Sequence, residues 1–126
     1  MNLEQFYEYA LAKKAVTEHF PFDEDTLVFK IGGKMFALTS LQDWEKGSPS
    51  VNLKGDPERN FELRAEYESI EPGFHMSKTH WNTVRFQGDV SDKLLLTLLD
   101  ESYNLVFSGL TKKAQHAILD QQQQPK

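Results

Sequence analysis

The chain has 126 residues, of which 39% are hydrophobic and 26% are charged, a composition typical of one globular domain with a single core. The formal net charge of −5 argues against a protein that coats nucleic acid, because phosphate neutralisation needs Lys and Arg. Cysteine is absent, which excludes disulfides and thiolate metal sites. The sequence shows neither an apolar run long enough to span a membrane nor a signal peptide, so we expect a cytoplasmic protein without membrane contact.

The first half of the chain predicts one helix followed by strands. Apolar side chains at helical spacing, after a capping residue at Asn2, predict a helix over residues 2–15. Extended segments are then predicted at residues 17–22, 26–31, 34–39 and 51–54. Gly32 and Gly33 form the hairpin turn between the second and third of these. Residues 44–50, with Gly47 and Pro49, are predicted to be a loop.

The second half predicts further helices around two more strands. Asp56 and Pro57 are suited to cap and begin a helix over residues 56–68. Extended segments follow at residues 74–76 and 81–87, joined by a polar turn. A long apolar-periodic helix begins after Ser91, is interrupted at Ser108 and Gly109, and is followed by a helical segment over residues 110–119.

This order of elements predicts the fold class. Strands joined by short turns favour a mainly antiparallel sheet, and helices on one face of such a sheet make an α+β two-layer sandwich. The predicted order is α-β(3)-α-β(2)-α. We expect a single domain over residues 1–120 and a polar, disordered tail over residues 121–126.

The chemically densest segment is residues 72–86, which contains two histidines and no acidic residue. In a binding interpretation, Lys78 contacts a phosphate, Asn82 a base edge, and Trp81 stacks on a base. In a structural interpretation, Trp81 anchors the core and His80 is tied to a backbone carbonyl. We favour the structural role for Trp81, because large aromatic side chains are most often buried.

Charge is unevenly distributed along the chain. Residues 26–42, 46–55 and 72–88 contain no Asp or Glu, whereas acids concentrate in residues 18–25 and 58–71. If the acid-free strands share one face of the sheet, the molecule has a basic face that can meet phosphates. The alternative is that strands simply carry fewer carboxylates.

Catalytic and metal-binding arrangements are hard to build from this sequence. His75 and His80 are two ligands where zinc usually takes three or four, and no cysteine completes a site. Ser102 has no evident His–Asp partnership and lies on an apolar-periodic helix. The Gly32-Gly33-Lys34 sequence lacks phosphate-loop spacing. We therefore predict no enzyme activity, no catalytic residues, no metal and no cofactor.

Several short motifs, in order over about residues 2–113, resemble those of the MmcQ/YjbR family of small bacterial proteins. They are His19-Phe-Pro-Phe22, Gly33-Lys-Met-Phe36, Asn52-Leu-Lys54 with Asp56-Pro57, Pro72-Gly-Phe-His75, Lys78-Thr-His-Trp81 with Thr83-Val84, and Ser102-Tyr103. The resemblance implies a compact α+β fold similar to type III secretion chaperones and to the CyaY/frataxin fold. It also implies DNA binding through a double-wing arrangement, and it brings no catalytic residues.

We therefore expect a monomeric, non-enzymatic DNA-binding protein that contacts nucleic acid through basic hairpins. The predicted nucleic-acid-binding residues are Lys30, Lys34, Lys54, Lys78, His80, Asn82 and Arg85. The alternative is a protein-interaction module comparable in fold to secretion chaperones, with no nucleic-acid binding. A third interpretation is a small-molecule pocket lined by His75, His80 and Trp81.

Overall fold

The computed structural model describes residues 1–121 of the chain. Its helices are α1 (Leu3–Leu11), α2 (Leu41–Lys46), α3 (Pro57–Glu66), α4 (Asp92–Ser108) and α5 (Lys112–Gln121). Its strands are β1 (Thr17–His19), β2 (Thr26–Ile31), β3 (Lys34–Ser40), β4 (Ser50–Lys54), β5 (Ile70–Pro72) and β6 (Trp81–Arg85). The tail that we predicted to be disordered, residues 121–126, lies outside the described residues except for Gln121, at which α5 ends.

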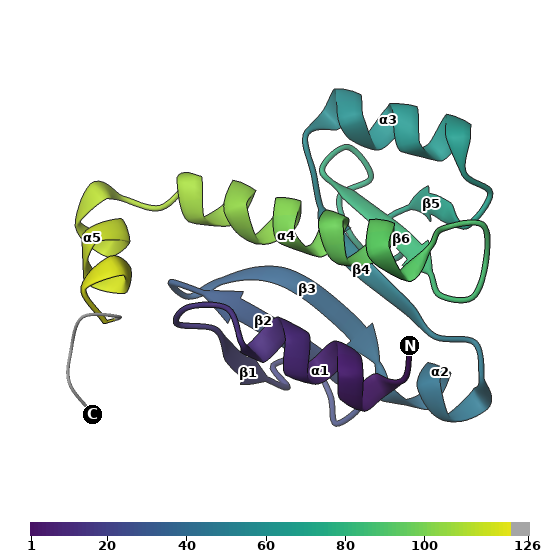
Figure 1. The fold of residues 1–126 in the computed structure, drawn as a ribbon, viewed down its shortest axis with the longest axis horizontal. Helices are drawn as coiled ribbons and strands as arrows, with labels where there is room; N and C mark the ends of the chain where they lie inside the picture. The colour runs from purple at the N-terminus through teal and green to yellow at the C-terminus, as the bar shows by residue number, and fades with distance from the viewer. Residues whose placement is uncertain (122–126) are drawn as a thin grey trace.

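The strands form one antiparallel sheet in the order β1-β2-β3-β4-β6-β5. Figure 1 shows α1 and α4 lying across this sheet, with α3 beside β5 and β6. The predicted α+β sandwich with helices on one face of a mainly antiparallel sheet is therefore confirmed. The element order differs from the predicted α-β(3)-α-β(2)-α, because α2 and a fourth strand, β4, lie between β3 and α3, and α5 follows α4. Among residues 1–121, every helix is too short or too polar to cross a membrane.

The loop predicted over residues 44–50 is wrong in its first part, which belongs to α2. The Ser40 side chain accepts a hydrogen bond from Asp43 N and caps the start of this helix. Gly47, at φ 83°, supplies the left-handed residue that ends it. A helix of six residues has too few apolar positions to show a period, so only its caps were visible in the sequence.

The strand before the 73–80 loop is also displaced from its predicted position. The extended segment is β5, whereas residues 74–76, which we predicted to be extended, lie in the loop. Gly73 N still donates to Trp81 O at 2.9 Å, but Phe74 N donates to the Thr83 hydroxyl at 2.9 Å. The chain therefore leaves the ladder at Phe74 because a side chain takes over its amide.

The first helix is shorter than predicted and ends at Leu11 rather than near residue 15. Its start is correct, since Asn2 and Gln5 form the expected capping box. Beyond it, Ala15 adopts a φ of 60°, which no α-helix contains.

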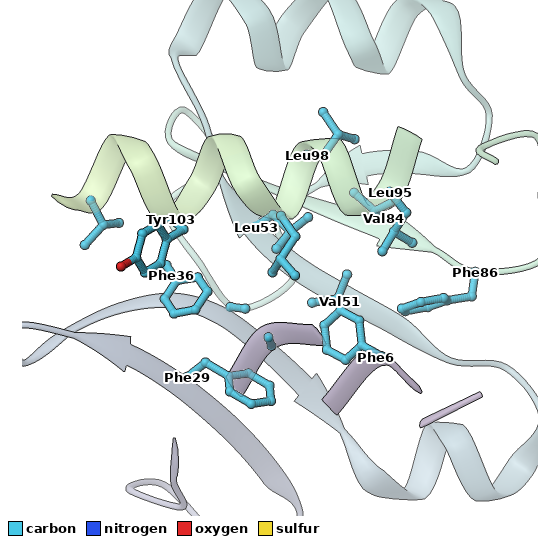
Figure 2. Packing of buried hydrophobic residues seen from close by; sticks show 14 of the residues in the cluster. Phe6, Phe29, Phe36, Val51, Leu53, Val84, Phe86, Leu95, Leu98 and Tyr103 are labelled. Atoms are coloured by element: carbon cyan, nitrogen blue, oxygen red, sulfur yellow. The ribbon is translucent and has the colours of Figure 1, made fainter. Parts of the chain in front are cut away.

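The hydrophobic core lies between the sheet and the helices, and Figure 2 shows its side chains meeting there. Phe6 of α1 packs edge-on against Phe29 and Phe86, with ring centroids 6.0 and 5.5 Å apart. On α4, Tyr103 packs edge-on against Phe36 at 5.4 Å. Such edge-to-face pairs add to the stabilisation from burying these rings, so the aromatic residues hold α1 and α4 to the sheet.

A second, smaller cluster lies on the other face of the sheet. It consists of Val28, Leu38 and Trp81, with Met35 and Met76 packed against them. Its members come from strands and from the 73–80 loop, and no helical residue among the described ones belongs to it. We refer to this side of the sheet as the open face. Trp81 is 7% exposed, so its predicted structural role is confirmed, although it packs away from the helices.

Candidate functional site

Five of the seven predicted binding residues gather at one end of the sheet. Lys30 and Lys54 alternate with core residues along β2 and β4, so both side chains are on the open face. Lys34 is the first residue after the β2–β3 turn. The amide of Gly55, the residue after β4, donates a hydrogen bond to the His80 carbonyl at 2.9 Å, so the His80 backbone lies beside the end of β4. We refer to Lys30, Lys34, Lys54, Lys78 and His80 as the basic end.

The start of α5 adds two cations that are not among the predicted binding residues. A methyl group built on Gly32 would lie 2.6 Å from Leu110 Cδ1, so the β2–β3 turn touches the connection between α4 and α5. Lys112 and Lys113 follow directly, and Figure 1 shows α5 at this end of the molecule. The signal was present in the sequence, because residues 102–119 contain no Asp or Glu.

The other two predicted residues are not part of the basic end. Arg85 is the last residue of β6 and pairs with Ser50 of β4, at the far end of the sheet. Its guanidinium forms an ion pair with Glu71 at 3.1 Å. Asn82 is 3% exposed and accepts a hydrogen bond from Arg64 Nε at 2.6 Å. The predicted contact between Asn82 and a base edge is therefore wrong, because strand alternation places this side chain on the helix-covered face.

The 73–80 loop, which contains most of the densest sequence segment, is fastened from inside the domain. The Lys78 ammonium donates to Gly73 O at 2.7 Å, closing the loop on itself. Arg64 of α3 donates to the Lys78 and Trp81 carbonyls, and Asn60 donates to Thr79 O at 3.2 Å. Charged and amide donors thus satisfy the carbonyls of a segment that has left the sheet.

Two strand residues fasten the same loop from the open face. Thr83 Oγ accepts from Phe74 N at 2.9 Å and is 2.5 Å from Asn52 Oδ1, to which it donates. Asn52 Nδ2 in turn donates to Phe74 O at 3.2 Å. These contacts leave the Phe74 ring 66% exposed, beside the His75 ring at a centroid distance of 4.0 Å. The motif residues therefore build the loop, and Phe74 and His75 are what it displays.

The open face carries a groove of about 770 Å³. Its floor is formed by β3, β4 and β6, and its walls are residues 22–26 on one side and the 73–80 loop on the other. The size is within the range of sites that hold small ligands or peptide side chains. Of the three residues proposed for a small-molecule pocket, only His75 lines this groove; Trp81 is buried and His80 lies at the basic end.

Hydrogen bonds fix the acidic wall of the groove. Asp23 accepts from Thr26 N at 2.6 Å and from Asp25 N at 2.9 Å, and these backbone bonds hold the pKa of its carboxyl group below the usual value. Asp25 accepts from the Ser40 hydroxyl at 2.6 Å and from Gln42 N at 2.7 Å. The turn before β2 is thus locked to the start of α2.

The arrangement offers little for catalysis. Ser102 is fully buried; its hydroxyl donates to Phe36 O at 2.6 Å and accepts from Lys54 N at 2.9 Å. Within residues 1–121, no three His, Cys, Asp or Glu residues lie close enough together to hold a metal ion. The basic end and the groove are the two surface features at which a ligand could be bound.

Comparison with known proteins establishes the family. The sequence profile of YjbR matches residues 11–105. The chain belongs to the YjbR family. It is 42% identical over 99 residues to protein YbdF of Escherichia coli O157:H7, covering 79% of each chain. It is 28% identical over 103 residues to YjbR of Escherichia coli K12, covering 82% of this chain and 85% of that one. Both relatives are described as uncharacterized, so the family resemblance is confirmed without a function.

Solved structures of relatives share the fold. The crystal structure of Deinococcus radiodurans protein DR2400, with a DUF419 domain, superposes with a TM-score of 0.84 at 39% identity, covering 93% of this chain and 87% of that one. A Pseudomonas syringae protein superposes with a TM-score of 0.69 at 28% identity, covering 83% and 98%. This chain therefore shares its fold with both of these proteins.

Proposed function

We propose that this YjbR family protein is a monomeric, non-enzymatic protein that binds nucleic acid through its basic end. The observation that supports the proposal is the meeting of two hairpins there. The β2–β3 turn brings Lys34, and the 73–80 loop between β5 and β6 brings Lys78 and His80. Lys54 at the end of β4 lies between them, because β4 is the strand between β3 and β6.

Phosphate contacts explain how an acidic protein binds an acidic polymer. The basic end presents ammonium groups on and beside β2, β3 and β4, three strands that contain no Asp or Glu. The carboxylates of residues 18–25 and 58–71 repel the nucleic-acid backbone elsewhere. Binding is then oriented, with only one end of the molecule meeting the phosphates. Arg85 and Asn82 have no part in it, so base-edge readout is not included in the proposal.

Fluorescence anisotropy with a labelled DNA duplex tests this proposal. Between about 50 and 200 mM salt, affinity should fall about tenfold for two phosphate contacts and about a hundredfold for four. The double variant Lys34→Glu, Lys54→Glu should lose binding at low salt. Lys78 is left unchanged, since its ammonium also closes the loop on Gly73 O.

A matched control keeps the charge change and moves its position. Lys46 of α2 and Lys93 of α4 are exposed and lie away from the basic end, so Lys46→Glu, Lys93→Glu alters net charge equally. This control should retain most of the binding. Equal losses in the two double variants, or the absence of binding at low salt, would contradict the proposal.

Protein interaction is the second candidate, and one observation favours it. The groove is flanked by Phe22 and Phe74, whose side chains are 63% and 66% exposed. Large apolar side chains that stay exposed around one concave surface are typical of sites that bind another molecule.

A further inference from the structure

We propose that the groove on the open face binds an extended, cationic peptide segment of another protein, with an apolar side chain of that segment seated between Phe22 and Phe74. This inference does not depend on nucleic-acid binding, because the groove and the basic end have only Lys78 in common. It rests on the shape of the groove, the stiffness of its walls and the sign of its charge.

The two walls display matching apolar groups. Phe22 lies just before the turn that leads into β2, and Phe74 follows Gly73 in the 73–80 loop. Leu38 and Met76 supply an apolar surface between the walls. A groove of about 770 Å³ with this lining has room for one large side chain and the backbone on each side of it.

The walls are already ordered before anything binds. Asp23 and Asp25 fix one wall through the hydrogen bonds to backbone amides and Ser40. Asn52 and Thr83 fix the other at Phe74. A partner therefore meets aromatic side chains on rigid supports, which lowers the entropy lost on binding.

The charge of the groove selects the occupant. Asp23, Asp25 and Asp43 line one side, and none of them takes part in an ion pair among the described residues. The cations that line the groove are already engaged: Lys78 donates to Gly73 O, and Arg85 pairs with Glu71. Three uncompensated carboxylates favour Lys and Arg on the partner and disfavour nucleic acid in this groove.

The neighbouring sheet edge argues against capture by strand addition. Within β5, Pro72 has no amide hydrogen and Ile70 N already donates to Tyr67 O at 3.2 Å. An incoming strand would find few free donors on this edge. Recognition by side chains in the groove is therefore the mode that the structure supports.

An NMR titration of the ¹⁵N-labelled chain tests the proposal with three pools of synthetic nine-residue peptides. The first pool has a variable apolar residue at its centre and two Lys or Arg on each side. The second replaces the basic residues by Glu, and the third replaces the central residue by Ala. We expect the first pool alone to saturate below about 1 mM and to shift the amides of Phe22, Phe74 and Thr83.

Variants separate the groove from other exposed apolar surface. Phe22→Ser and Phe74→Ser should each weaken binding of the first pool about tenfold or more. Phe61 of α3 is 72% exposed and does not line the groove, so Phe61→Ser is the matched control and should change nothing. Asp43→Asn should weaken binding about twofold to fivefold and reduce its dependence on salt.

Several outcomes would overturn the inference. Equal binding of the Glu pool would remove the electrostatic argument, and equal binding of the Ala pool would remove the apolar anchor. Shifts confined to the basic end, no saturable shifts, or self-association of the chain through the Phe residues would remove the peptide as occupant. The Lys34→Glu, Lys54→Glu variant should bind the first pool normally, which distinguishes this result from that of the DNA titration.

Discussion

Ser102 bridges two strands at the point where their ladder separates. Register pairs join β3 and β4 at only two positions, and the Ser102 hydroxyl lies beyond them, between Phe36 O and Lys54 N. Ser102→Ala should reduce the free energy of unfolding by about 1–3 kcal/mol, because both buried backbone groups lose their partner. Urea denaturation measures this change. Ser108 of the same helix is exposed, and Ser108→Ala should stay within about 0.5 kcal/mol.

Single residues also show the limit of prediction from sequence. Trp81 and Asn82 are adjacent, so strand alternation requires them to face opposite sides of the sheet. The sequence did not reveal which side the helices cover, because Trp81 and Val84 are both apolar and face opposite sides as well. The structural role of Trp81 was predicted correctly, and the position of Asn82 was not.

At the scale of elements, the 73–80 loop depends on α3. Arg64 donates to Asn82 Oδ1, to the Lys78 carbonyl in the loop and to the Trp81 carbonyl at the start of β6. A lysine ammonium cannot reproduce this fork of donors. Arg64→Lys should therefore loosen the loop and increase the rate of chymotrypsin cleavage after Phe74. The free energy of unfolding should fall by about 1–3 kcal/mol.

The neighbouring helix arginine provides the control. Arg59 is exposed and pairs with Glu101 at 3.3 Å. Arg59→Lys should leave both the cleavage rate and the stability nearly unchanged, since exposed ion pairs contribute little. If cleavage after Phe74 were the same in all three proteins, Arg64 would have no role in holding the loop.

Elements with local signals were predicted well, and elements defined by distant partners were not. The Gly32-Gly33 turn and the capping residues Asn2 and Ser91 are local features, and each is where the sequence indicated. β5 is a strand because β6 pairs with it, so its three residues carried no pattern of their own. The groove was missed for the same reason, since its walls are about 50 residues apart along the chain.

At the scale of the whole molecule, acid stability depends on carboxylates that hold turns. Hydrogen bonds from the Ser69 hydroxyl and amide lower the pKa of the Asp89 carboxyl group, and backbone amides lower that of Asp23. A lowered pKa stabilises the fold above the usual value of 3.8, and this stabilisation is lost as the pH falls through the folded-state pKa. The melting temperature should therefore drop steeply below about pH 4.

Substitution isolates this contribution. Asp89→Asn should lower the melting temperature at neutral pH, and its difference from the parent protein should shrink as the pH falls below about 4. Asp56 precedes α3 without making a side-chain capping hydrogen bond. The melting temperature of Asp56→Asn should therefore differ from that of the parent protein by the same amount at every pH. Parallel curves for Asp89→Asn as well would show that Asp89 is not responsible. Calorimetric scans between about pH 2 and 7 provide the comparison.

The hydroxyl between β3 and β4 has a consequence for the newly made chain. When Lys54 leaves the ribosome, its amide has to wait for a helix residue 48 positions later, and the strand that will flank β4 has not been translated either. The nascent sheet therefore ends in an unpaired edge at β4 until β6 emerges, and the separation between β3 and β4 stays unbridged until α4 follows. An unpaired strand edge is the stage at which strand-to-strand aggregation threatens a chain. Synthesis of the last third of the protein, rather than formation of the first hairpin, determines when this sheet is protected from aggregation.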